Sequence, residues 1–428
     1  MFANKNYLLL VTICFFSLQS FSQKKAYFID GYHGGVWGHY PKGYTRYVVD
    51  QLKMHPDWKI NLEIEPETWD HEKVDAPEAY EEFKKLFDDQ SSNGRIEYVS
   101  AAFGQPYLYN ISGESIIRNF EYGMRKVREH FPNTTFTTYS SEEPCFTSAL
   151  PQILTSFGYK YASLKNPNTL WGGYTRNFGG ELVNWIGPDG TKLTTVPRYE
   201  VELLKPGSTW ETIGNANSHE YINAALDYGI QNPIGMCLQD AGWRVGPWLK
   251  GGFYKPTEYV TWRNYFDNIV NKTAVRDWDF SQEDIMPGLV WGAQVLQTIS
   301  QQVRYSENKI IQAEKLASMA QIFNGLPYPL KQIDKAWRPL MLSQHHDCWI
   351  VPYNGKKGDT WADKVVLWTD TTDNLSDDVI AKSVGSFSKS AASTANGVRV
   401  FNTTGSLRSE WVALPLPQGW VASQTIIT

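Results

Sequence analysis

Three features are scarce in this chain, and each scarcity removes a class of protein. The 428 residues contain four cysteines, and the three beyond position 14 (Cys145, Cys237 and Cys348) are too widely spaced for a disulfide framework. Each is therefore expected to pack as a small buried apolar side chain. Beyond the first 18 residues no apolar run approaches the roughly 20 residues that a membrane-spanning helix needs. Charge of one sign is also lacking: a net charge of −5, spread over short mixed runs, gives no reason to expect nucleic acid or an anionic membrane as partner.

Several catalytic motifs are missing from the sequence as well. It contains no Gly-x-Ser-x-Gly elbow, no phosphate-binding P-loop, no His-Glu-x-x-His pair and no Asp-rich loop with calcium spacing. Aromatic residues, in contrast, make up 14% of the chain, with 17 Trp and 24 Tyr. Most of them are expected in large aromatic cores, although flat aromatic faces are also what sugar-binding sites use.

The N-terminus has the pattern of a secretory signal. Lys5 supplies a basic start, residues 7–18 are apolar, and residues 20–23 are small or polar. Residues 1–23 are therefore predicted to be a cleaved signal peptide, which indicates a secreted or periplasmic protein that is not integral to the membrane.

Short apolar strands alternate with helical patterns from about residue 24 to residue 275. Residues 26–29, 59–64 and 96–99 read as strands, and apolar residues at intervals of three and four predict a helix over residues 116–131. Residues 185–193 predict a hairpin around a Pro-Asp-Gly turn. Strands that alternate with helices indicate a mostly parallel sheet, open or closed into a barrel, with its chemistry at the C-terminal ends of the strands.

Residues 276–385 have a different character. A long amphipathic pattern runs over residues 295–320, is interrupted by Pro327 and Pro329, and resumes over residues 333–342, which predicts a helical subdomain. Residues 398–405 and 410–416, within the last segment 386–428, read as two β-strands. Two strands cannot bury a face by themselves.

Two places in the chain carry candidate catalytic groups. The apolar strand over residues 233–238 delivers Asp240 to its C-terminal end, close to Trp243, whose ring could raise the pKa of the carboxyl group by desolvation. An Asp that caps the next helix is the alternative. His345, His346 and Asp347 bring metal-binding and sugar-binding groups to one point, although a hydrogen-bonded core histidine is the commoner reason for such a residue.

Four segments, in order along the chain, resemble the N-terminal catalytic region of glycoside hydrolase family 38, the retaining α-mannosidases that use zinc. They are residues 30–37, 141–154, 236–243 and 344–347. The resemblance covers about residues 26–410. It implies an α/β fold with a (β/α)7-type barrel, a helical (three-helix) subdomain that completes the site, and the first strands of a β-domain.

The resemblance also implies roles for individual residues. Glu142 stands where the family has its nucleophile, with Glu143 beside it, and Asp240 stands where the family has its acid/base. Two solvated loop acids are the alternative for Glu142 and Glu143. Trp37 matches a residue that stacks under the sugar, and Asp347 one that accepts hydrogen bonds from sugar hydroxyls. Trp243 is taken as a further substrate-binding residue.

The metal region departs from the family pattern. Tyr32 and Gly34 occupy the two ligand positions of the first loop, and Gly34 has no side chain with which to bind a metal. Asp30 and His33 lie nearby, and His346 matches the family's other zinc ligand. A re-spaced zinc site that uses His33, Glu142 and His346, with Asp30 as a fourth candidate ligand, is therefore one interpretation. Asp30 and His33 otherwise contribute to the sugar pocket.

These observations lead to one main hypothesis and one alternative. The chain is interpreted as an exported glycoside hydrolase, α-mannosidase-like, that cleaves a terminal sugar from an oligo- or polysaccharide. The altered metal loop argues for a sugar other than mannose. The alternative is a catalytically inactive, glycan-binding or accessory protein of the same fold. Both predict a carbohydrate partner.

Overall fold

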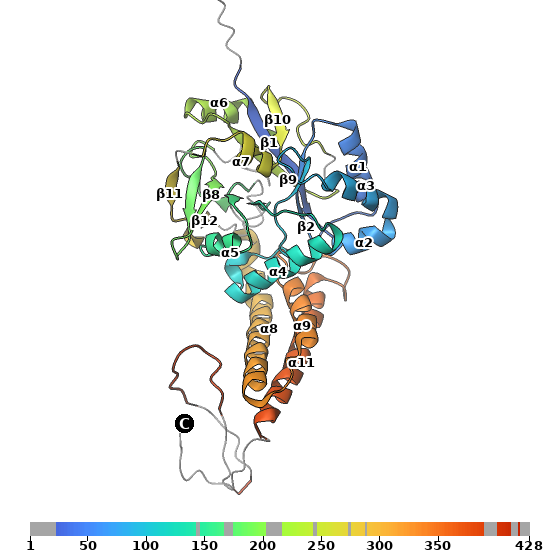
Figure 1. Cartoon of the computed structure of the whole chain (residues 1–428), viewed down its shortest axis with the longest axis vertical. Coiled ribbons are helices and arrows are strands. Elements are labelled where there is room, and N and C mark those ends of the chain that lie inside the picture. The colour runs from blue at the N-terminus through green and yellow to red at the C-terminus, as the bar shows by residue number, and fades with distance from the viewer. Residues whose placement is uncertain are drawn as a thin grey trace, which may run out of the picture. The chain divides into compact units, whose positions relative to one another are not determined.

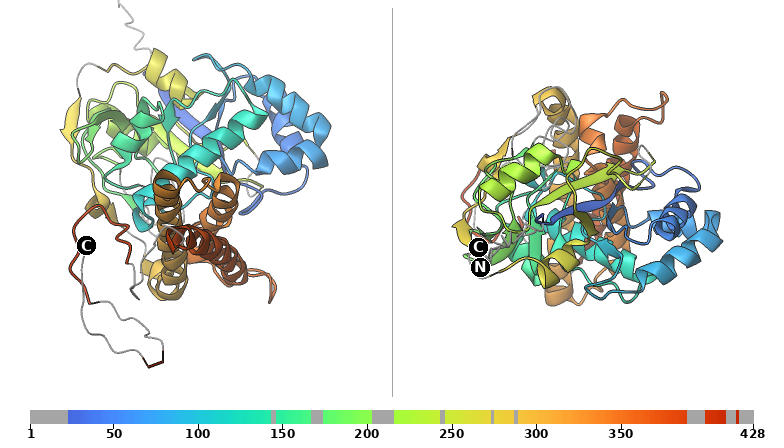
Figure 2. Two further views of the ribbon diagram at one scale, coloured as in Figure 1. Left: turned by 60° about the horizontal axis from the view of Figure 1, so that its bottom comes forward. Right: turned by 90° about the horizontal axis from the view of Figure 1, so that it is seen from above.

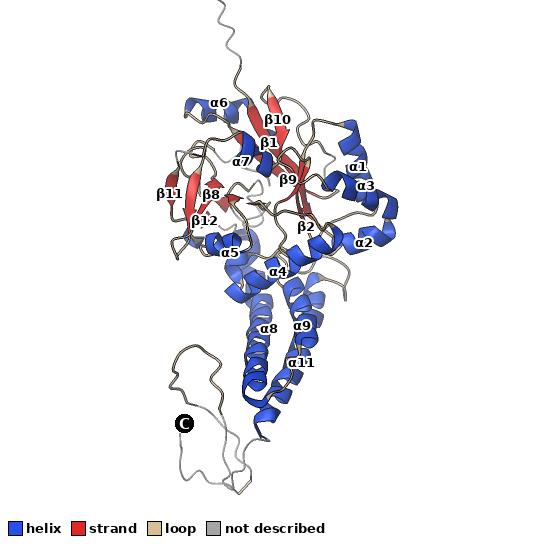
Figure 3. Cartoon of the chain, in the orientation of Figure 1, coloured by secondary structure: helices blue, strands red, loops and turns tan. Residues whose placement is uncertain are grey.

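The computed structural model describes residues 23–142, 146–166, 174–202, 216–242, 246–272, 275–286, 289–388, 400–411 and 418–419. The chain divides into two compact units, Met1–Ser300 with Gln344–Ala362 and Gln301–Ser343 with Asp363–Thr428. Strands and shorter helices make up the first unit, and long helices make up the second (Figure 1, Figure 3).

A parallel sheet around strand β1 (Ala26–Gly34) forms the centre of the first unit. β1 pairs with β10 (Thr257–Val260) along its first half, with β2 (Ile60–Ile64) along its second half, and with β9 (Ile234–Asp240) on its other edge. β3 (Ile96–Tyr98) extends the sheet beyond β2. Every residue of β1 and β2 is buried, as expected for parallel strands covered on both faces.

Helices lie beside this sheet. They are α1 (Tyr44–Met54), α2 (Thr68–Asp75), α3 (Pro77–Phe87) and α4 (Gly113–His130), of which the first three cluster together in Figure 1. α4 confirms the helix predicted from periodicity. Its Ser112 cap accepts a hydrogen bond from the N–H of Ser115, and its face with Phe120 and Val127 is buried.

A second sheet has the order β11-β7-β8-β5-β4. β7 (Val183–Ile186) and β8 (Lys192–Val196) form the predicted antiparallel hairpin, whereas β8, β5 (Tyr161–Ser163) and β4 (Thr138–Tyr139) run parallel. The remaining elements are β11 (Arg276–Trp278), the pair β6 (Tyr174–Thr175) and β12 (Ile285–Met286), and the helices α5 (Leu150–Ser156), α6 (His219–Asp227) and α7 (Trp262–Asn268).

The predicted α/β architecture with parallel strands is confirmed, but a closed barrel is not. Within the described residues no strand pairing joins the sheet around β1 to the sheet around β8. The polar residues at the ends of β1, β2, β4 and β9 nevertheless come together in one place.

The second unit is a bundle of long helices. α8 (Leu289–Asn324, of which residues from 301 belong to this unit), α9 (Leu330–Ser343) and α11 (Trp361–Ser388) lie side by side in Figure 2. The indole of Trp337 on α9 donates to Glu314 on α8 over 3.0 Å, and Gln302 on α8 donates to Thr369 on α11 over 2.7 Å. The helical prediction and the break at Pro327 and Pro329 are confirmed. The short helix α10 (Asp347–Ile350) belongs to the first unit.

The predictions for the two ends of the chain fall largely outside the described residues. Residues 1–22, predicted as a signal, are among those not described, as are 389–399 and 412–417. Residues 400–411 contain no strand, so the partial β-domain over 386–428 stays a prediction. Cys237 and Cys348 are buried and form no disulfide, while Cys145 is not described. None of the described helices is both long and apolar enough to cross a membrane.

Candidate active site

A row of three titratable side chains crosses the C-terminal ends of three parallel strands. The strand register sets His33 of β1 opposite Glu63 of β2 on one side and opposite Asp240 of β9 on the other. Residues in register on adjacent strands point to the same face of a sheet. The C-terminal edge of a parallel sheet is also where α/β enzymes carry their chemistry.

Glu63 brings a fourth strand end into this row. Its Oε2 atom accepts a hydrogen bond from the backbone N–H of Glu142 over 2.7 Å and lies 3.0 Å from Nδ1 of His33. Its Oε1 atom accepts a hydrogen bond from the hydroxyl of Ser141 over 2.8 Å. Ser141 and Glu142 follow β4, so one buried carboxylate fixes the loop that carries the predicted nucleophile against β1.

The charges around His33 decide its protonation. Burial alone lowers the pKa of His33, but the hydrogen bond to Glu63 and the charges of Glu63, Glu142 and Asp240 outweigh burial and raise the pKa well above its ordinary value. Burial raises the pKa of Asp240, and the charge of His33 offsets this only in part. The neighbouring carboxylates thus favour the imidazolium form of His33, and burial favours the protonated form of Asp240.

His346 reaches the same place from the turn before α10. Its Nδ1 lies 2.7 Å from the carbonyl oxygen of Gln105, to which it donates, and its ring centroid lies 5.1 Å from that of His33. Gln105 has a left-handed backbone (φ 44°), and its side chain donates to the carbonyls of Gly34 and Glu63 at the ends of β1 and β2. A strained backbone of this kind is typical of functional sites.

His345 is held differently from its neighbour. Its Nδ1 accepts a hydrogen bond from the backbone N–H of Asp347 over 3.0 Å, so Nε2 carries the proton and donates to Oε1 of Glu65 over 2.8 Å. Burial keeps the pKa of His345 well below its ordinary value, in agreement with a neutral ring. Both rings are buried and hydrogen-bonded, so the alternative of a hydrogen-bonded core histidine describes His345 and His346 alike.

Glu65 links this turn to the loop that carries Trp37. Its carboxylate accepts the backbone N–H groups of Trp37 over 2.5 Å and Gly38 over 2.8 Å, in addition to His345. Burial raises the pKa of Glu65 to about 7 even though these donors lower it. The partly exposed Trp37 also donates from its indole nitrogen to Glu67 over 2.8 Å. Asp347, whose side chain is 26% exposed, lies beside the same loop and can reach a ligand.

Asp30 does not join the row. It is fully buried and, by the alternation of side chains along a strand, lies on the face of β1 opposite His33. Its carboxylate accepts hydrogen bonds from Trp58, Gln239 and the backbone of Gly31 and Trp248. Burial raises its pKa to about 6. The structure thus places Asp30 in the protein core, where four donors occupy its carboxylate, rather than in a sugar pocket or a metal site.

Some of the other predicted site residues lie in the site, and the rest lie outside the described residues. Glu142, Asp240, His33 and His346 come together, and Trp37 and Asp347 lie on neighbouring loops. Glu143 and Trp243 lie outside the described residues. Sequence reasoning missed four residues that organise the site: Glu63, Glu65, Gln105 and Ser141. A carboxylate at the end of the strand predicted over residues 59–64 was the available signal for Glu63 and Glu65.

The comparison with known proteins agrees with this geometry. The model of the "Glycosyl hydrolases family 38 N-terminal domain" matches residues 39–287, more than half of the chain. The chain belongs to glycoside hydrolase family 38. The resemblance found in the sequence motifs is thereby confirmed. No curated protein sequence matches the chain.

Solved structures of low sequence identity share the fold. An alpha-mannosidase from Enterococcus faecalis V583 is 14% identical with a TM-score of 0.56, covering 86% of this chain and 43% of that one. A family 38 protein from Enterococcus faecalis is 17% identical with a TM-score of 0.51, covering 85% and 40%. A GH57 branching enzyme from Thermococcus kodakaraensis is 9% identical with a TM-score of 0.54, covering 86% and 93%. The chain thus spans less than half the length of the two family 38 structures.

The side chains present do not fit the zinc ion that the family resemblance implies. A zinc site needs three or four N, O or S ligands. Among the described residues, His345, His346 and Asp347 are the one group of three whose ligand atoms lie within 4.8 Å of one another, and both nitrogens of His345 are already engaged. At position 34, a Cβ atom would lie 2.8 Å from the carbonyl oxygen of His39, so the backbone leaves no room for a ligand side chain. No step of the chemistry below uses a metal.

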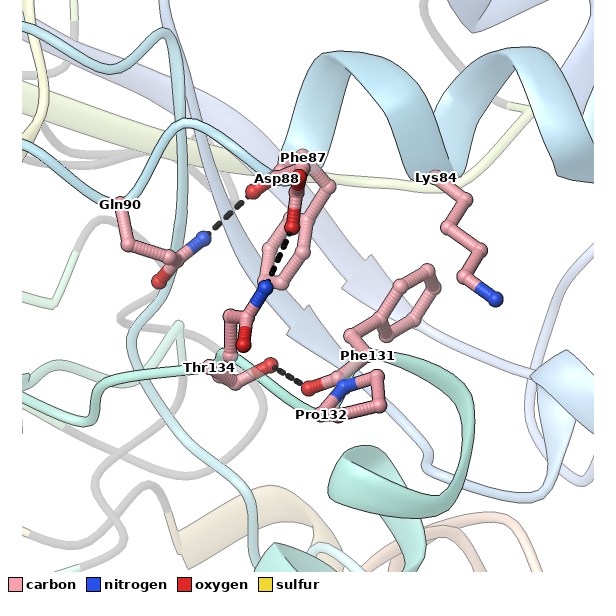
Figure 4. Close-up of a pocket in the computed structure, with 8 residues that line it drawn as sticks. Lys84, Phe87, Asp88, Gln90, Phe131, Pro132 and Thr134 are labelled. Carbon is pink, nitrogen blue, oxygen red and sulfur yellow. Dashed lines mark hydrogen bonds between the residues drawn. The ribbon is translucent and has the colours of Figure 1, made fainter.

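A hollow elsewhere in the first unit offers no competing site. It has a volume of only about 20 Å³ and lies between the loops that precede β3 and β4, at the N-terminal edge of the strands (Figure 4). Its polar side chains bond to the protein itself: Asn133 donates to Asp88, Gln90 to the carbonyl of Phe87, and Thr134 to the carbonyl of Phe131. Such an arrangement serves stability rather than catalysis.

Proposed function

We propose that this protein is a glycoside hydrolase that removes a terminal sugar from an oligo- or polysaccharide, with Glu142 as nucleophile and Asp240 as acid/base. One observation carries the proposal. Two carboxyl groups from distant parts of the sequence meet around His33 at the C-terminal ends of parallel strands. Glycoside hydrolysis uses two such carboxyl groups on either side of the scissile bond.

The environment of each group suits its proposed role. Asp240 is partly exposed, and its raised pKa lets it keep the proton that a leaving glycosidic oxygen needs. Glu142 is 1% exposed, and its backbone N–H donates to Glu63, which holds Glu142 beside the end of β2. The charge of Glu142 is one of those that raise the pKa of His33, so the two groups interact in the site.

Two further residues are suited to hold the sugar. The ring of Trp37 offers an aromatic face whose backbone is fixed by Glu65, and Asp347 offers carboxylate oxygens to hydroxyl groups. Family membership supports an α-mannosidase-like activity, and the changed ligand positions at Tyr32 and Gly34 favour a sugar other than mannose. Export through residues 1–23 is part of the same proposal.

A panel of nitrophenyl glycosides tests this function. The purified chain is expected to cleave at least one of them, and Asp240→Asn and Glu142→Gln are expected to lower kcat by about 10²- to 10⁴-fold, the usual contribution of such groups. Asp75→Asn is a matched control because Asp75 is an exposed residue of α2. Cleavage that both active-site variants retain would refute the assignment.

A non-catalytic glycan-binding protein is the second candidate. The substituted ligand positions at Tyr32 and Gly34 favour it. Calorimetric titration with mono- and oligosaccharides separates the two candidates. Absence of turnover over the whole panel, together with binding that Asp347→Asn or Trp37→Ala abolishes, would establish the binding protein in place of the hydrolase.

A further inference from the structure

The acidic groups of the site surround one basic side chain. His33, which is 5% exposed, lies in register with Glu63 on one side and Asp240 on the other, and its Nδ1 lies 3.0 Å from Glu63. Glu63 in turn accepts the backbone N–H of Glu142. Carboxylates gathered in a buried place repel one another unless a cation lies between them. In metal-dependent hydrolases that cation is a metal ion bound by the carboxylates and by histidine nitrogens.

In this chain, hydrogen bonds within the protein already occupy two of the groups that could bind a metal ion, Glu63 and His345. Glu63 receives Ser141 on one oxygen, and Glu142 and His33 on the other. His345 uses both ring nitrogens, one toward Glu65 and one toward Asp347. Among the described residues, His33, Glu142 and His346 do not form a group of three whose ligand atoms lie within 4.8 Å of one another. The one such group is His345, His346 and Asp347, and without His345 it offers two ligands, one fewer than the smallest zinc site has.

The backbone at the end of β1 also argues against a metal. Gly34 has a φ of 108°, and the carbonyl oxygen of His39 fills the space of its missing Cβ atom. Gly35 has a φ of 155°, and a Cβ atom there would lie 2.4 Å from the side chain of Glu65. The loop is therefore packed around glycine, and a ligand side chain at position 34 would require the backbone to move.

We propose that this active site binds no zinc ion, and that the His33–Glu63 pair occupies the place among the carboxylates that a metal cation takes in metal-dependent hydrolases. Glu63 holds the ring of His33 in position, and His33 faces Glu142 and Asp240. Without an ion to chelate two neighbouring hydroxyl groups, the sugar is held by hydrogen bonds and aromatic contact alone. Only this last statement rests on the hydrolase function proposed above.

Metal analysis of the purified full-length chain tests the proposal without reference to activity. Elemental analysis is expected to find less than about 0.1 zinc ion per chain, where a structural or catalytic site would hold close to one. The melting temperature is expected to stay the same after EDTA treatment and after addition of excess zinc. About one zinc ion per chain that is lost in His33→Gln or His346→Gln would overturn the proposal. Zinc retained equally by the wild type and by both variants lies outside this site and supports it.

The variants also separate this proposal from the hydrolase function. His33→Gln should lower turnover of any cleaved glycoside at least about 100-fold, as loss of a charge in a preorganised site does, and added zinc should not restore it. His219→Gln is the matched control, since His219 is exposed at the start of α6. A chain without zinc that cleaves no glycoside would refute the hydrolase and leave the metal-free site standing. Zinc-dependent cleavage would support the hydrolase function and refute the metal-free site.

Discussion

Replacement of Glu63 by Gln gives the sharpest test of the site's electrostatics. The carbonyl of Gln can accept the same donors, Glu142 N–H and His33 Nδ1, while the hydroxyl of Ser141 can turn to accept from the new amide. The substitution therefore removes a buried charge and keeps the shape and the hydrogen bonds. Any change in the pKa of His33 then reports the loss of its ion pair with Glu63.

The expected loss of stability follows from the burial of both partners. Glu63 is 2% and His33 5% exposed, so solvent screens their interaction little. Breaking a buried ion pair costs about 3–5 kcal/mol when the remaining charge persists. His33 can instead release its proton, which limits the loss, so about 2–3 kcal/mol is expected near pH 6.

The pH dependence of this loss has a definite sign. The pKa of His33 is raised in the folded chain, so the stability it contributes is fully present below its unfolded pKa of about 6.5 and is lost as the pH rises through the folded pKa. The difference between wild type and Glu63→Gln should therefore be largest near pH 6 and shrink at alkaline pH. Urea unfolding followed by tryptophan fluorescence measures it over this range.

Two measurements decide whether the reasoning holds. In NMR spectra of selectively labelled histidines, Glu63→Gln should lower the pKa of His33, whose signal is assigned from His33→Gln. Ser141→Ala is the control: it removes one hydrogen bond, should cost about 1 kcal/mol, and should leave the pH dependence unchanged. An unchanged pKa of His33 in Glu63→Gln would refute the ion pair as the source of its charge.

Two further changes test the framework around the site. Gly34→Ala should destabilise the chain by about 2–3 kcal/mol in urea unfolding, because the new methyl group clashes with the His39 carbonyl in addition to the roughly 1–2 kcal/mol cost of a positive φ. Gly43→Ala is the control, since Gly43 has a φ of 82° and open space around it, and it should show the conformational cost alone. Equal losses of stability in the two variants would contradict the clash at position 34. Lys165→Met should destabilise by about 3–5 kcal/mol, because Lys165 is buried and bonds to the buried Glu202 over 2.5 Å. The double variant with Glu202→Gln should recover part of that loss, and simple additivity of the two single variants would rule out their coupling.

Local patterns in the sequence determine much of the fold by themselves. Intervals of three and four residues predict α4 and the long helix α8, the Pro-Asp-Gly turn predicts the hairpin β7–β8, and the apolar strand β9 puts Asp240 at its C-terminal end. These features depend on neighbours within one element, which the sequence displays directly. Membership of family 38 can be inferred from the sequence, because the family's motifs are short segments that follow one another in the same order along this chain.

Only the tertiary structure assigned the chemistry within the site. His345 and His346 are equivalent in the sequence, but His345 donates from Nε2 to the carboxylate of Glu65, whereas His346 donates from Nδ1 to the carbonyl of Gln105. Asp30 and His33 lie three residues apart, yet the pleat sends one into the core and the other into the row with Glu63 and Asp240. Strand register and long-range contacts set these partners, and both depend on residues far away in the chain, which no local pattern encodes.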